Sequence, residues 1–162
     1  MCNLLCGKFI NTPGVTKLVQ LEPNASVGLW AIDLVTIDTP ACQPCLSPVE
    51  LERATRFICI QDRTNYLAAH IALRYLLAHV TGLKPQTLAF TQGPFGKPAV
   101  SAAPPCLFNL SQSGSWALVG ISHGSAATEI GVDIEVLRPL EDMQALATGV
   151  LTPLEQIGRA HV

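Results

Sequence analysis

The chain has 162 residues, of which 49% are hydrophobic and only 14% are charged, and its formal net charge is −2. This length suits one domain or part of a slightly larger one, and it excludes two ordinary domains. No apolar run approaches the roughly 18 residues that would span a bilayer, and the first ten residues lack the features of a signal peptide. The composition therefore predicts a cytoplasmic protein without a membrane segment.

The charges are unevenly distributed along the chain. Residues 53–100 hold six basic side chains against Asp62 alone, whereas residues 101–162 hold two basic side chains against six acidic ones. A basic middle beside an acidic C-terminal part suits a polyphosphate held between cationic side chains and a metal site. An ordinary solvated charge distribution is the competing interpretation.

The six cysteines include one C-x-x-C pair, Cys42 and Cys45. Because nothing indicates secretion, we expect reduced and incidental thiols. A zinc site that adds Cys2 and Cys6 to this pair is the alternative, although the spacing of the first two cysteines is loose.

The N-terminal half predicts one strand followed by a capped helix. Residues 1–26 show no clear hydrophobic period, so we expect a leader or a loosely packed opening segment. Residues 27–37 are almost all apolar, which predicts a strand buried on both faces. Ser47-Pro48-Val49-Glu50 then combines an N-cap hydroxyl, a proline at the first helical position and a glutamate at the third. A helix should begin there and run to about Phe57.

A second helix and several short strands are predicted after it. The helix should run from about Asp62 to a glycine stop at Gly82, with an apolar stripe that faces a sheet. The strands are separated by Gly- and Pro-rich turns, and their predicted ranges are Leu88–Thr91, Phe108–Leu110, Trp116–Ser122 and Glu129–Glu135.

The last of these segments alternates strictly between apolar and polar or small residues. Ile130, Val132 and Ile134 should line one face, and Glu129, Gly131, Asp133 and Glu135 the other. Two carboxylates at i and i+2 point the same way and repel unless a cation lies between them. Such paired oxygen ligands suit Mg²⁺, which completes its octahedron with water and substrate phosphates. An exposed acidic strand face is the alternative.

Four segments, at 46–57, 96–98, 108–114 and 131–135, resemble motifs of the 4'-phosphopantetheinyl transferases of the surfactin-synthetase type. They occur in the family's order over about residues 27 to 155: Leu46-Ser47-Pro48 with Glu52-Arg53-Ala54 and Arg56-Phe57 for the opening helix, Gly96-Lys97-Pro98 for the G-K-P motif, Phe108 to Gly114 for the F-N-x-S-H-S-G segment, and Gly131-Val132-Asp133-Ile134-Glu135 for the metal motif. The resemblance implies an α+β fold of two related strand-and-helix halves, here residues 27–107 and an incomplete second half at 108–156.

The same resemblance implies an activity and a set of site residues. The family transfers the 4'-phosphopantetheine arm of coenzyme A to a serine of an acyl or peptidyl carrier protein of fatty-acid, polyketide or nonribosomal-peptide synthesis. Coenzyme A and the carrier protein are the implied partners, and neither nucleic acid nor a membrane is expected. The implied roles are Mg²⁺ binding and catalysis for Asp133 and Glu135, binding of the 3'-phosphate for Arg53, a place beside the adenine nucleotide for Lys97, and phosphate contacts for Ser111 and Gln112.

Two departures from the family pattern modify this expectation. Gln112 stands where the family has a histidine, and because an amide cannot carry charge we expect weaker binding of coenzyme A. The later K-E-A-type motif is absent, while Thr152-Pro153-Leu154-Glu155 opens a helix seven residues before the last residue. Residues 157–162 equal the translation of a common sequencing-adapter read, so we expect them to be a non-native tail of a truncated chain. A non-catalytic remnant that binds coenzyme A or a carrier protein is the alternative function.

The histidines match none of these motifs. We expect surface or core roles for His70, His79 and His123. An α/β hydrolase is disfavoured because the sequence contains no G-x-S-x-G elbow.

Overall fold

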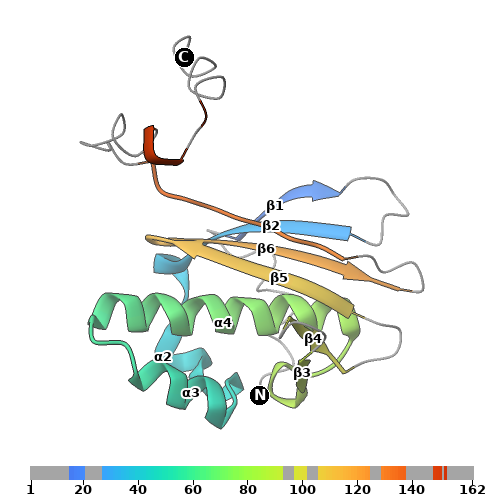
Figure 1. Cartoon of the computed structure of the whole chain (residues 1–162). Coiled ribbons are helices and arrows are strands. Elements are labelled where there is room, and N and C mark those ends of the chain that lie inside the picture. Colours follow the sequence, from blue (N-terminus) through green and yellow to red (C-terminus); the bar gives the residue numbers. More distant parts are fainter. Residues whose placement is uncertain are drawn as a thin grey trace.

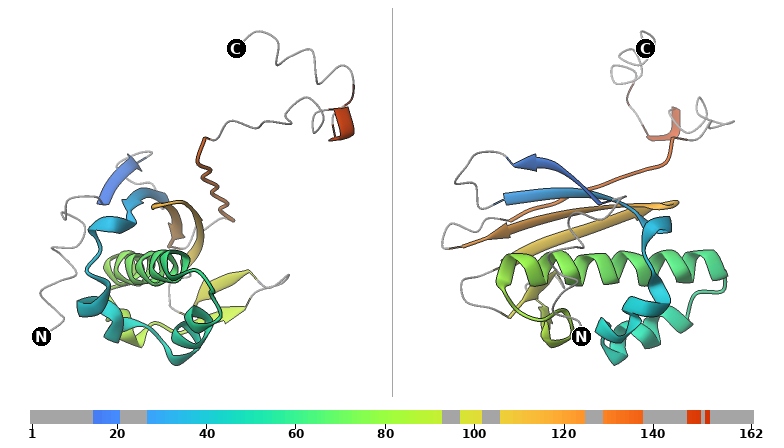
Figure 2. Two further views of the ribbon diagram at one scale, coloured as in Figure 1. Left: turned by 90° about the vertical axis from the view of Figure 1, so that its left-hand side faces the viewer. Right: turned by 180° about the vertical axis from the view of Figure 1, so that it is seen from behind.

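A long helix, α4 (Ile60–Thr81), lies in the middle of the molecule, and an antiparallel sheet curls around it (Figure 1; Figure 2). This computed structural model describes residues 27–92, 97–101, 106–124, 129–137, 148–150 and 152, together with the backbone of residues 15–20. The predicted α+β class is confirmed, since helices and an antiparallel sheet share one hydrophobic core.

The sheet has six strands in the order β1-β2-β6-β5-β4-β3. Their bounds are β1 (Val15–Gln20), β2 (Val27–Asp33), β3 (Phe90–Gln92), β4 (Pro98–Val100), β5 (Cys106–Ser113) and β6 (Trp116–His123). The strand before the helices, β2, pairs with β6 along its whole length, from Val27 opposite Ser122 to Asp33 opposite Trp116. Strands far apart in sequence therefore lie side by side in the middle of the sheet.

Two shorter helices cover the side of α4 that faces away from the sheet (Figure 1). They are α2 (Thr39–Cys42) and α3 (Pro48–Thr55). The capping box predicted for α3 is confirmed: Glu50 N donates to Ser47 Oγ at 3.3 Å, and Ser47 N donates to Glu50 Oε2 at 2.7 Å. This reciprocal pair satisfies two backbone donors that a helix start would otherwise leave unpaired.

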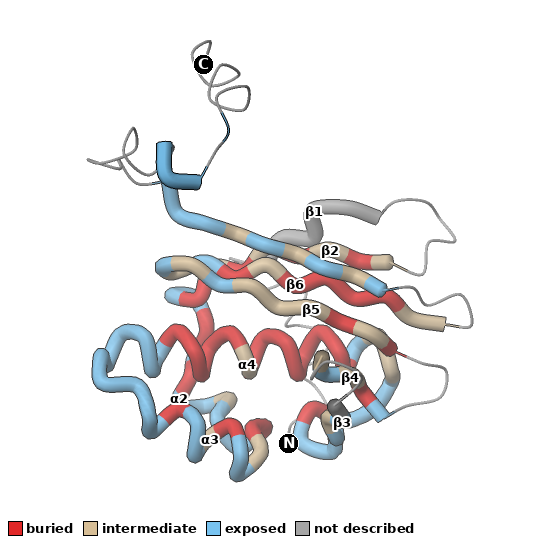
Figure 3. The backbone as a smooth tube through the Cα atoms, viewed as in Figure 1, coloured by how far each residue is buried: buried red, intermediate tan, exposed pale blue. Residues whose placement is uncertain are grey.

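The predicted second helix is also confirmed, and it ends as expected at Gly82, whose φ of +72° is left-handed. Its burial differs from the prediction of a single apolar stripe. Every residue from Asn65 to Ala78 is buried except His70, which is half-buried (Figure 3). The helix is covered on nearly all sides because the sheet packs against one side and α2 and α3 against the other.

The first two strands correct two expectations. The predicted strand at 27–37 ends at Asp33, where a 3₁₀ turn at Leu34–Thr36 begins and Asp33 Oδ1 accepts from Val35 N at 3.2 Å. It is not buried on both faces, because its residues alternate between half-buried and buried and only one face meets α4. Residues 15–20, expected as part of a loosely packed segment, form β1, which pairs with β2 at the edge of the sheet.

The segment 129–137 is extended but is not a strand, which corrects the prediction at Glu129–Glu135. Its burial alternates as predicted, with half-buried Ile130, Val132 and Ile134 between exposed neighbours. The segment passes over β5 and β6 on the face opposite α4 (Figure 1). Among the described residues it pairs with no strand backbone, and its N–H groups at Val132, Ile134 and Val136 bond to side chains of β5 instead.

The expected boundary between two halves at 107 and 108 falls inside β5, so the division into halves stays a prediction. Cys2, Cys6 and the suspected tail at 157–162 lie outside the described residues, as does most of the capping box at 152–155. None of the helices in the described part of the chain combines the length and the apolar character needed to cross a membrane.

Candidate functional site

Strand β5 positions the predicted site residues on its two faces. Phe108 and Gln112 stand opposite Ile121 and Ala117 of β6, which are fully buried beneath the sheet. Opposite partners in an antiparallel pair share a face, so the even-numbered residues of β5 face α4. Asn109, Ser111 and Ser113 therefore point to the other face, over which the segment 129–137 runs.

These three outward side chains hold the segment 129–137 in place. Asn109 Oδ1 accepts from Val132 N at 2.8 Å, and the hydroxyls of Ser111 and Ser113 accept from Ile134 N and Val136 N at 3.2 Å each. Side chains spaced by two along β5 thus replace the ladder of a neighbouring strand.

Each serine hydroxyl also donates to a carboxylate of the same segment. Ser111 Oγ lies 2.8 Å from Asp133 Oδ1, and Ser113 Oγ lies 2.9 Å from Glu135 Oε2. Both acidic residues are exposed. The structure therefore brings Ser111, Asp133 and Glu135 together. Their expected contacts with phosphate and Mg²⁺ stay predictions.

The donor chemistry of this pair fits Mg²⁺. No described residue hydrogen-bonds to the second oxygen of either carboxylate, and the serine contacts fix both side chains to one strand. Within the described residues no group of three or more His, Cys, Asp or Glu gathers into a metal site. Two carboxylates are nevertheless enough for Mg²⁺, which keeps several waters and takes further oxygens from phosphates.

Lys97 contacts the first two residues of the segment 129–137. Its Nζ pairs with Glu129 Oε2 at 2.5 Å and donates to the backbone oxygen of Ile130 at 2.7 Å. The lysine is half-buried and the glutamate is exposed, so the ion pair itself contributes little to stability. The expected place of Lys97 beside an adenine nucleotide stays a prediction.

On the α4 face, a pocket of about 460 Å³ opens beside Gln112 and Arg53. Its other polar side chains are those of Tyr66 and His70 of α4. Asn109 of β5 also lines the pocket, although its side chain points to the other face of the sheet. Its apolar wall is formed by Phe57, Leu73, Pro98, Phe108 and Leu110. Two of the residues expected to bind phosphate, Arg53 and Gln112, thus line one cavity, with a permanent positive charge from the arginine.

The pocket with Arg53 and Gln112 and the carboxylate pair Asp133 and Glu135 lie on opposite faces of β5 and meet at a free edge of this strand. Strand β4 pairs with β5 only at Leu107 and Cys106, whereas β6 pairs with β5 as far as Ser113. Among the described residues, no strand borders the other edge of β5 from residue 109 onward. Ser111 and Gln112 are sequence neighbours on opposite faces at this edge, so a long ligand can reach both clusters by crossing it.

Aromatic rings stack along the pocket wall. The ring centroids of Phe57 and Tyr66 are 5.1 Å apart, and those of Tyr66 and His70 are 4.0 Å apart. Arg53 Cζ lies 5.8 Å from the centroid of Tyr66, within cation–π distance. Burial raises the pKa of Tyr66 although Arg53 opposes this, so the phenol keeps its proton at neutral pH and remains a donor.

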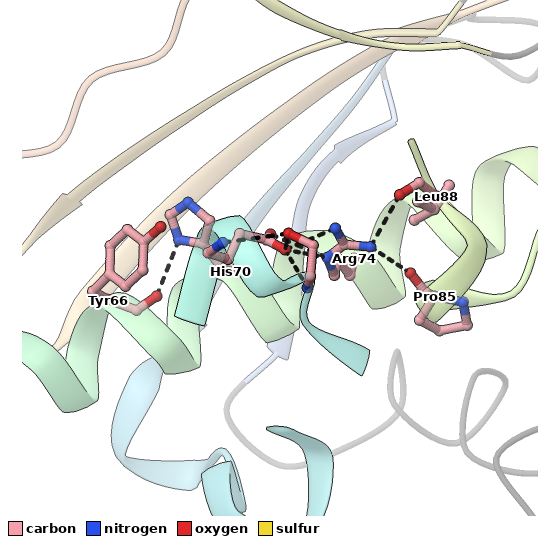
Figure 4. Close-up of polar contacts among 7 residues, drawn as sticks. Tyr66, His70, Arg74, Pro85 and Leu88 are labelled. Atoms are coloured by element: carbon pink, nitrogen blue, oxygen red, sulfur yellow. Dashed lines mark hydrogen bonds and ion pairs between the residues drawn. The ribbon is translucent and has the colours of Figure 1, made fainter. Parts of the chain in front are cut away.

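A buried ion pair joins α3 to α4, the two helices that contribute Arg53, Tyr66 and His70 to the pocket (Figure 4). Arg74 Nε donates to Glu50 Oε2 at 2.9 Å, and Arg74 Nη1 donates to the backbone oxygens of Pro85 at 2.7 Å and Leu88 at 3.2 Å. Burial alone would raise the pKa of Glu50, but hydrogen bonds from Arg74 and Ser47 and the charge of Arg74 outweigh it and lower the pKa. The carboxylate therefore stays ionised inside the protein.

The sequence motifs include neither Tyr66 and His70, which line the pocket, nor Arg74, which pairs with Glu50. These three residues follow one another at intervals of four on α4, which places them in a row on one side of the helix. A row of polar or aromatic residues at this spacing inside an apolar helix is the signal in the sequence that identifies them.

Comparisons with known proteins agree with the motifs. A family model described as "4'-phosphopantetheinyl transferase, N-terminal" matches residues 38–123, more than half of the chain. A putative 4'-phosphopantetheinyl transferase of Synechocystis sp. is 37% identical over 137 residues, which cover 82% of this chain and 53% of the relative. The 4'-phosphopantetheinyl transferase HetI of Nostoc sp. is 35% identical over 137 residues, which cover 80% of this chain and 55% of HetI. The chain spans about half the length of the curated relatives it matches.

Among solved structures, the holo-[acyl-carrier-protein] synthase of Helicobacter pylori in complex with coenzyme A aligns with a TM-score of 0.44 and 13% identity. The alignment covers 60% of this chain and 99% of that one.

Proposed function

Since the chain belongs to the 4'-phosphopantetheinyl transferase family, we propose that it serves to transfer the 4'-phosphopantetheine arm of coenzyme A to a serine of an acyl or peptidyl carrier protein. The observation that carries this proposal is the meeting of two clusters at the free edge of β5. One is a cationic pocket with Arg53 and Gln112, and the other is the carboxylate pair Asp133 and Glu135.

Coenzyme A has phosphate groups at two separate places, which suits this arrangement. We assign its 3'-phosphate to the pocket, where Arg53 supplies a fixed positive charge and Gln112 an amide donor. The pyrophosphate then crosses the edge of β5 toward Asp133 and Glu135. Lys97 contacts the start of the segment 129–137, and its charge is paired with Glu129.

Asp133 and Glu135 would hold Mg²⁺, which neutralises negative charge on the pyrophosphate. Ser111 and Ser113 orient the two carboxylates through their hydroxyls, so that neither side chain has to be ordered when the ligand binds. The repulsion between the two carboxylates favours occupation by a cation.

In the proposed reaction, the hydroxyl oxygen of the carrier serine forms a bond to the β-phosphorus of coenzyme A. The bond from that phosphorus to the bridging oxygen breaks, adenosine 3',5'-bisphosphate leaves with the bonding electrons, and the hydroxyl proton is released to solvent. The residues of this chain contribute by binding and orienting the phosphates.

The second candidate function is binding of coenzyme A or a carrier protein without turnover. Gln112 favours it, because an amide in the pocket offers a weaker hydrogen bond to phosphate than a charged imidazole would. Both candidates require the same coenzyme A site, and they differ only in transfer. A cytoplasmic location remains a prediction in either case.

The test combines binding and transfer. The affinity of the chain for coenzyme A is measured by calorimetry with and without Mg²⁺, and an acyl carrier protein is then monitored by mass spectrometry for the added arm. We expect Mg²⁺ to tighten binding in the native chain but not in Asp133→Asn. The matched control is Asp62→Asn, which changes an exposed carboxylate in the first turn of α4.

Modification of the carrier supports the transferase, and Mg²⁺-dependent binding without modification supports the binding protein. Equal Mg²⁺ dependence in the native chain and Asp133→Asn would reject the assignment of the carboxylate pair.

A further inference from the structure

Within the buried stretch of α4, from Asn65 to Ala78, the cover is incomplete at one residue, His70. All other residues of the helix from Asn65 to Ala78 are buried by the sheet and by α2 and α3 (Figure 3). His70 is half-buried and lines the 460 Å³ pocket. The enclosed middle of the helix therefore presents one imidazole to the cavity that Arg53 also lines.

The orientation of this imidazole is fixed by a backbone contact. His70 Nδ1 lies 3.0 Å from the backbone oxygen of Tyr66, one turn earlier on α4 (Figure 4). Because a carbonyl oxygen can only accept, Nδ1 must carry the proton of the neutral ring, and Nε2 keeps its lone pair. Among the described residues Nε2 has no hydrogen-bond partner.

The charged groups around the ring leave the pocket positive. The charged groups are Glu50 and Arg53 on α3 and Arg74 on α4. The phenol of Tyr66 on α4 also faces the ring and is uncharged. The charge of Glu50 is committed to Arg74 through three contacts of 2.7 to 3.0 Å. The arginine on α3 has no described acidic partner within ion-pair distance, so the cavity attracts an anion.

We propose that His70 is a binding residue for a phosphate group in this pocket, and that Nε2 takes up a proton from solvent when the phosphate enters and then donates a hydrogen bond to it. The inference rests on the proposed function in one respect, since coenzyme A is the expected source of the phosphate. Beyond the proposed function, it assigns phosphate binding to His70, which belongs to none of the sequence motifs, and it couples binding to the uptake of a proton.

In the free protein His70 is neutral, so it can take up a proton when a phosphate binds. Burial lowers the pKa of His70, and Arg53 and Arg74 lower it further, although Glu50 and the Tyr66 carbonyl oppose them. The ring is therefore neutral at pH 7 in the empty pocket. A phosphate dianion nearby stabilises the imidazolium and raises the pKa, so binding near neutral pH is coupled to proton uptake.

The other polar groups of the pocket cannot take this role. Arg53 is always protonated, and Gln112 has no charged form. The phenol of Tyr66 retains its proton because burial raises its pKa. Of the described residues that line the pocket, His70 is thus the one that can gain a positive charge near neutral pH.

The test follows the His70 ring by NMR as a function of pH, first in the free native chain and then with sodium pyrophosphate and with coenzyme A as separate probes. We expect either probe to raise the pKa of His70. We also expect calorimetry in two buffers of different ionisation heat to show net proton uptake on binding near pH 7.

Two variants separate a binding role from a structural one. His70→Gln keeps a donor at about the place of Nε2 but cannot be charged, so binding should weaken roughly threefold to tenfold at pH 6 and lose most of its pH dependence. His79→Gln changes the exposed histidine in the last turn of the same helix and should leave both properties unaltered.

The outcomes distinguish this inference from the proposed function. Proton uptake and a shifted His70 titration support it even if no carrier protein is modified. A His70 titration that neither pyrophosphate nor coenzyme A moves would overturn it, and so would a pH dependence of binding that is the same in His70→Gln and the native chain.

Discussion

Arg74 Nη2 lies 2.7 Å from Glu50 Oε2 inside the protein, where the two side chains are only 2% and 8% exposed. The carboxylate also accepts from the backbone N and the hydroxyl of Ser47, which starts α3. The guanidinium in turn donates to two backbone oxygens after α4 and lies 4.8 Å from the ring centroid of Phe90. One ion pair therefore connects the start of α3, the middle of α4 and the chain that leads to β3.

Removal of one partner should strongly destabilise the fold. Glu50→Gln leaves the buried guanidinium of Arg74 without its counter-charge, so the free energy of unfolding should fall by about 3–5 kcal/mol. Urea denaturation at pH 7 measures it. Glu52→Gln is the matched control, because Glu52 pairs with Arg56 on the exposed side of α3, and its effect should stay within about 0.5 kcal/mol. Similar losses in the two variants would contradict a special role for the buried pair.

The contribution of Glu50 should depend on pH in a defined direction. Its pKa in the folded protein lies below the ordinary value of 4.5, so its contribution is fully present above that pH. It is lost as the pH falls through the lower pKa of the folded state, because the unfolded chain then binds the proton more readily. The difference in unfolding free energy between the native chain and Glu50→Gln should be constant from pH 7 to about 5 and then shrink. A difference in unfolding free energy that grows on acidification would contradict a lowered pKa of Glu50 in the folded protein.

A close approach at Gly120 should control the position of the segment 129–137. A Cβ atom there would lie 2.7 Å from Ile130 Cδ1 and 2.8 Å from Val132 Cγ1. We expect Gly120→Ala to displace the segment, to cost about 1–3 kcal/mol and to speed hydrogen exchange at Val132 N, which bonds to Asn109. Gly131→Ala is the control, since a Cβ atom there meets nothing within 4 Å. Unchanged exchange in Gly120→Ala would mean that the segment is not held against β6.

A histidine at position 112 should strengthen phosphate binding. Gln112 lines the pocket beside Arg53, and an imidazole in its place can carry charge. Gln112→His should bind coenzyme A roughly threefold to tenfold more tightly at pH 6 and show a smaller gain at pH 8, where the ring is neutral. Calorimetry at the two pH values measures the gain. The control is Gln86→His, on an exposed 3₁₀ turn away from this pocket. If Gln112→His and the native chain bound coenzyme A with equal affinity at both pH values, residue 112 would not contact the phosphate.

Features that depend on neighbouring residues could be predicted from the sequence alone. The capping box of Ser47 and Glu50 requires only a spacing of three residues, and the stop at Gly82 requires only a residue that accepts a left-handed φ. The alternation in the segment 129–137 is likewise a local property, since an extended backbone places successive side chains on opposite sides. The motifs identified Ser111, Asp133 and Glu135, and the structure places them together.

The tertiary structure alone decided which distant groups meet. The periodicity of 129–135 could not reveal that Asn109 and Ser111 take the place of a neighbouring strand, because hydrogen bonding by their side chains depends on how the sheet faces the segment. The sequence likewise places Arg74 within an apolar helix, and only the packing of α3 against α4 brings Glu50 to it. His70 lines the pocket for the same reason: local spacing sets the side of a helix on which a residue lies, whereas the packing of other elements determines whether that side is covered.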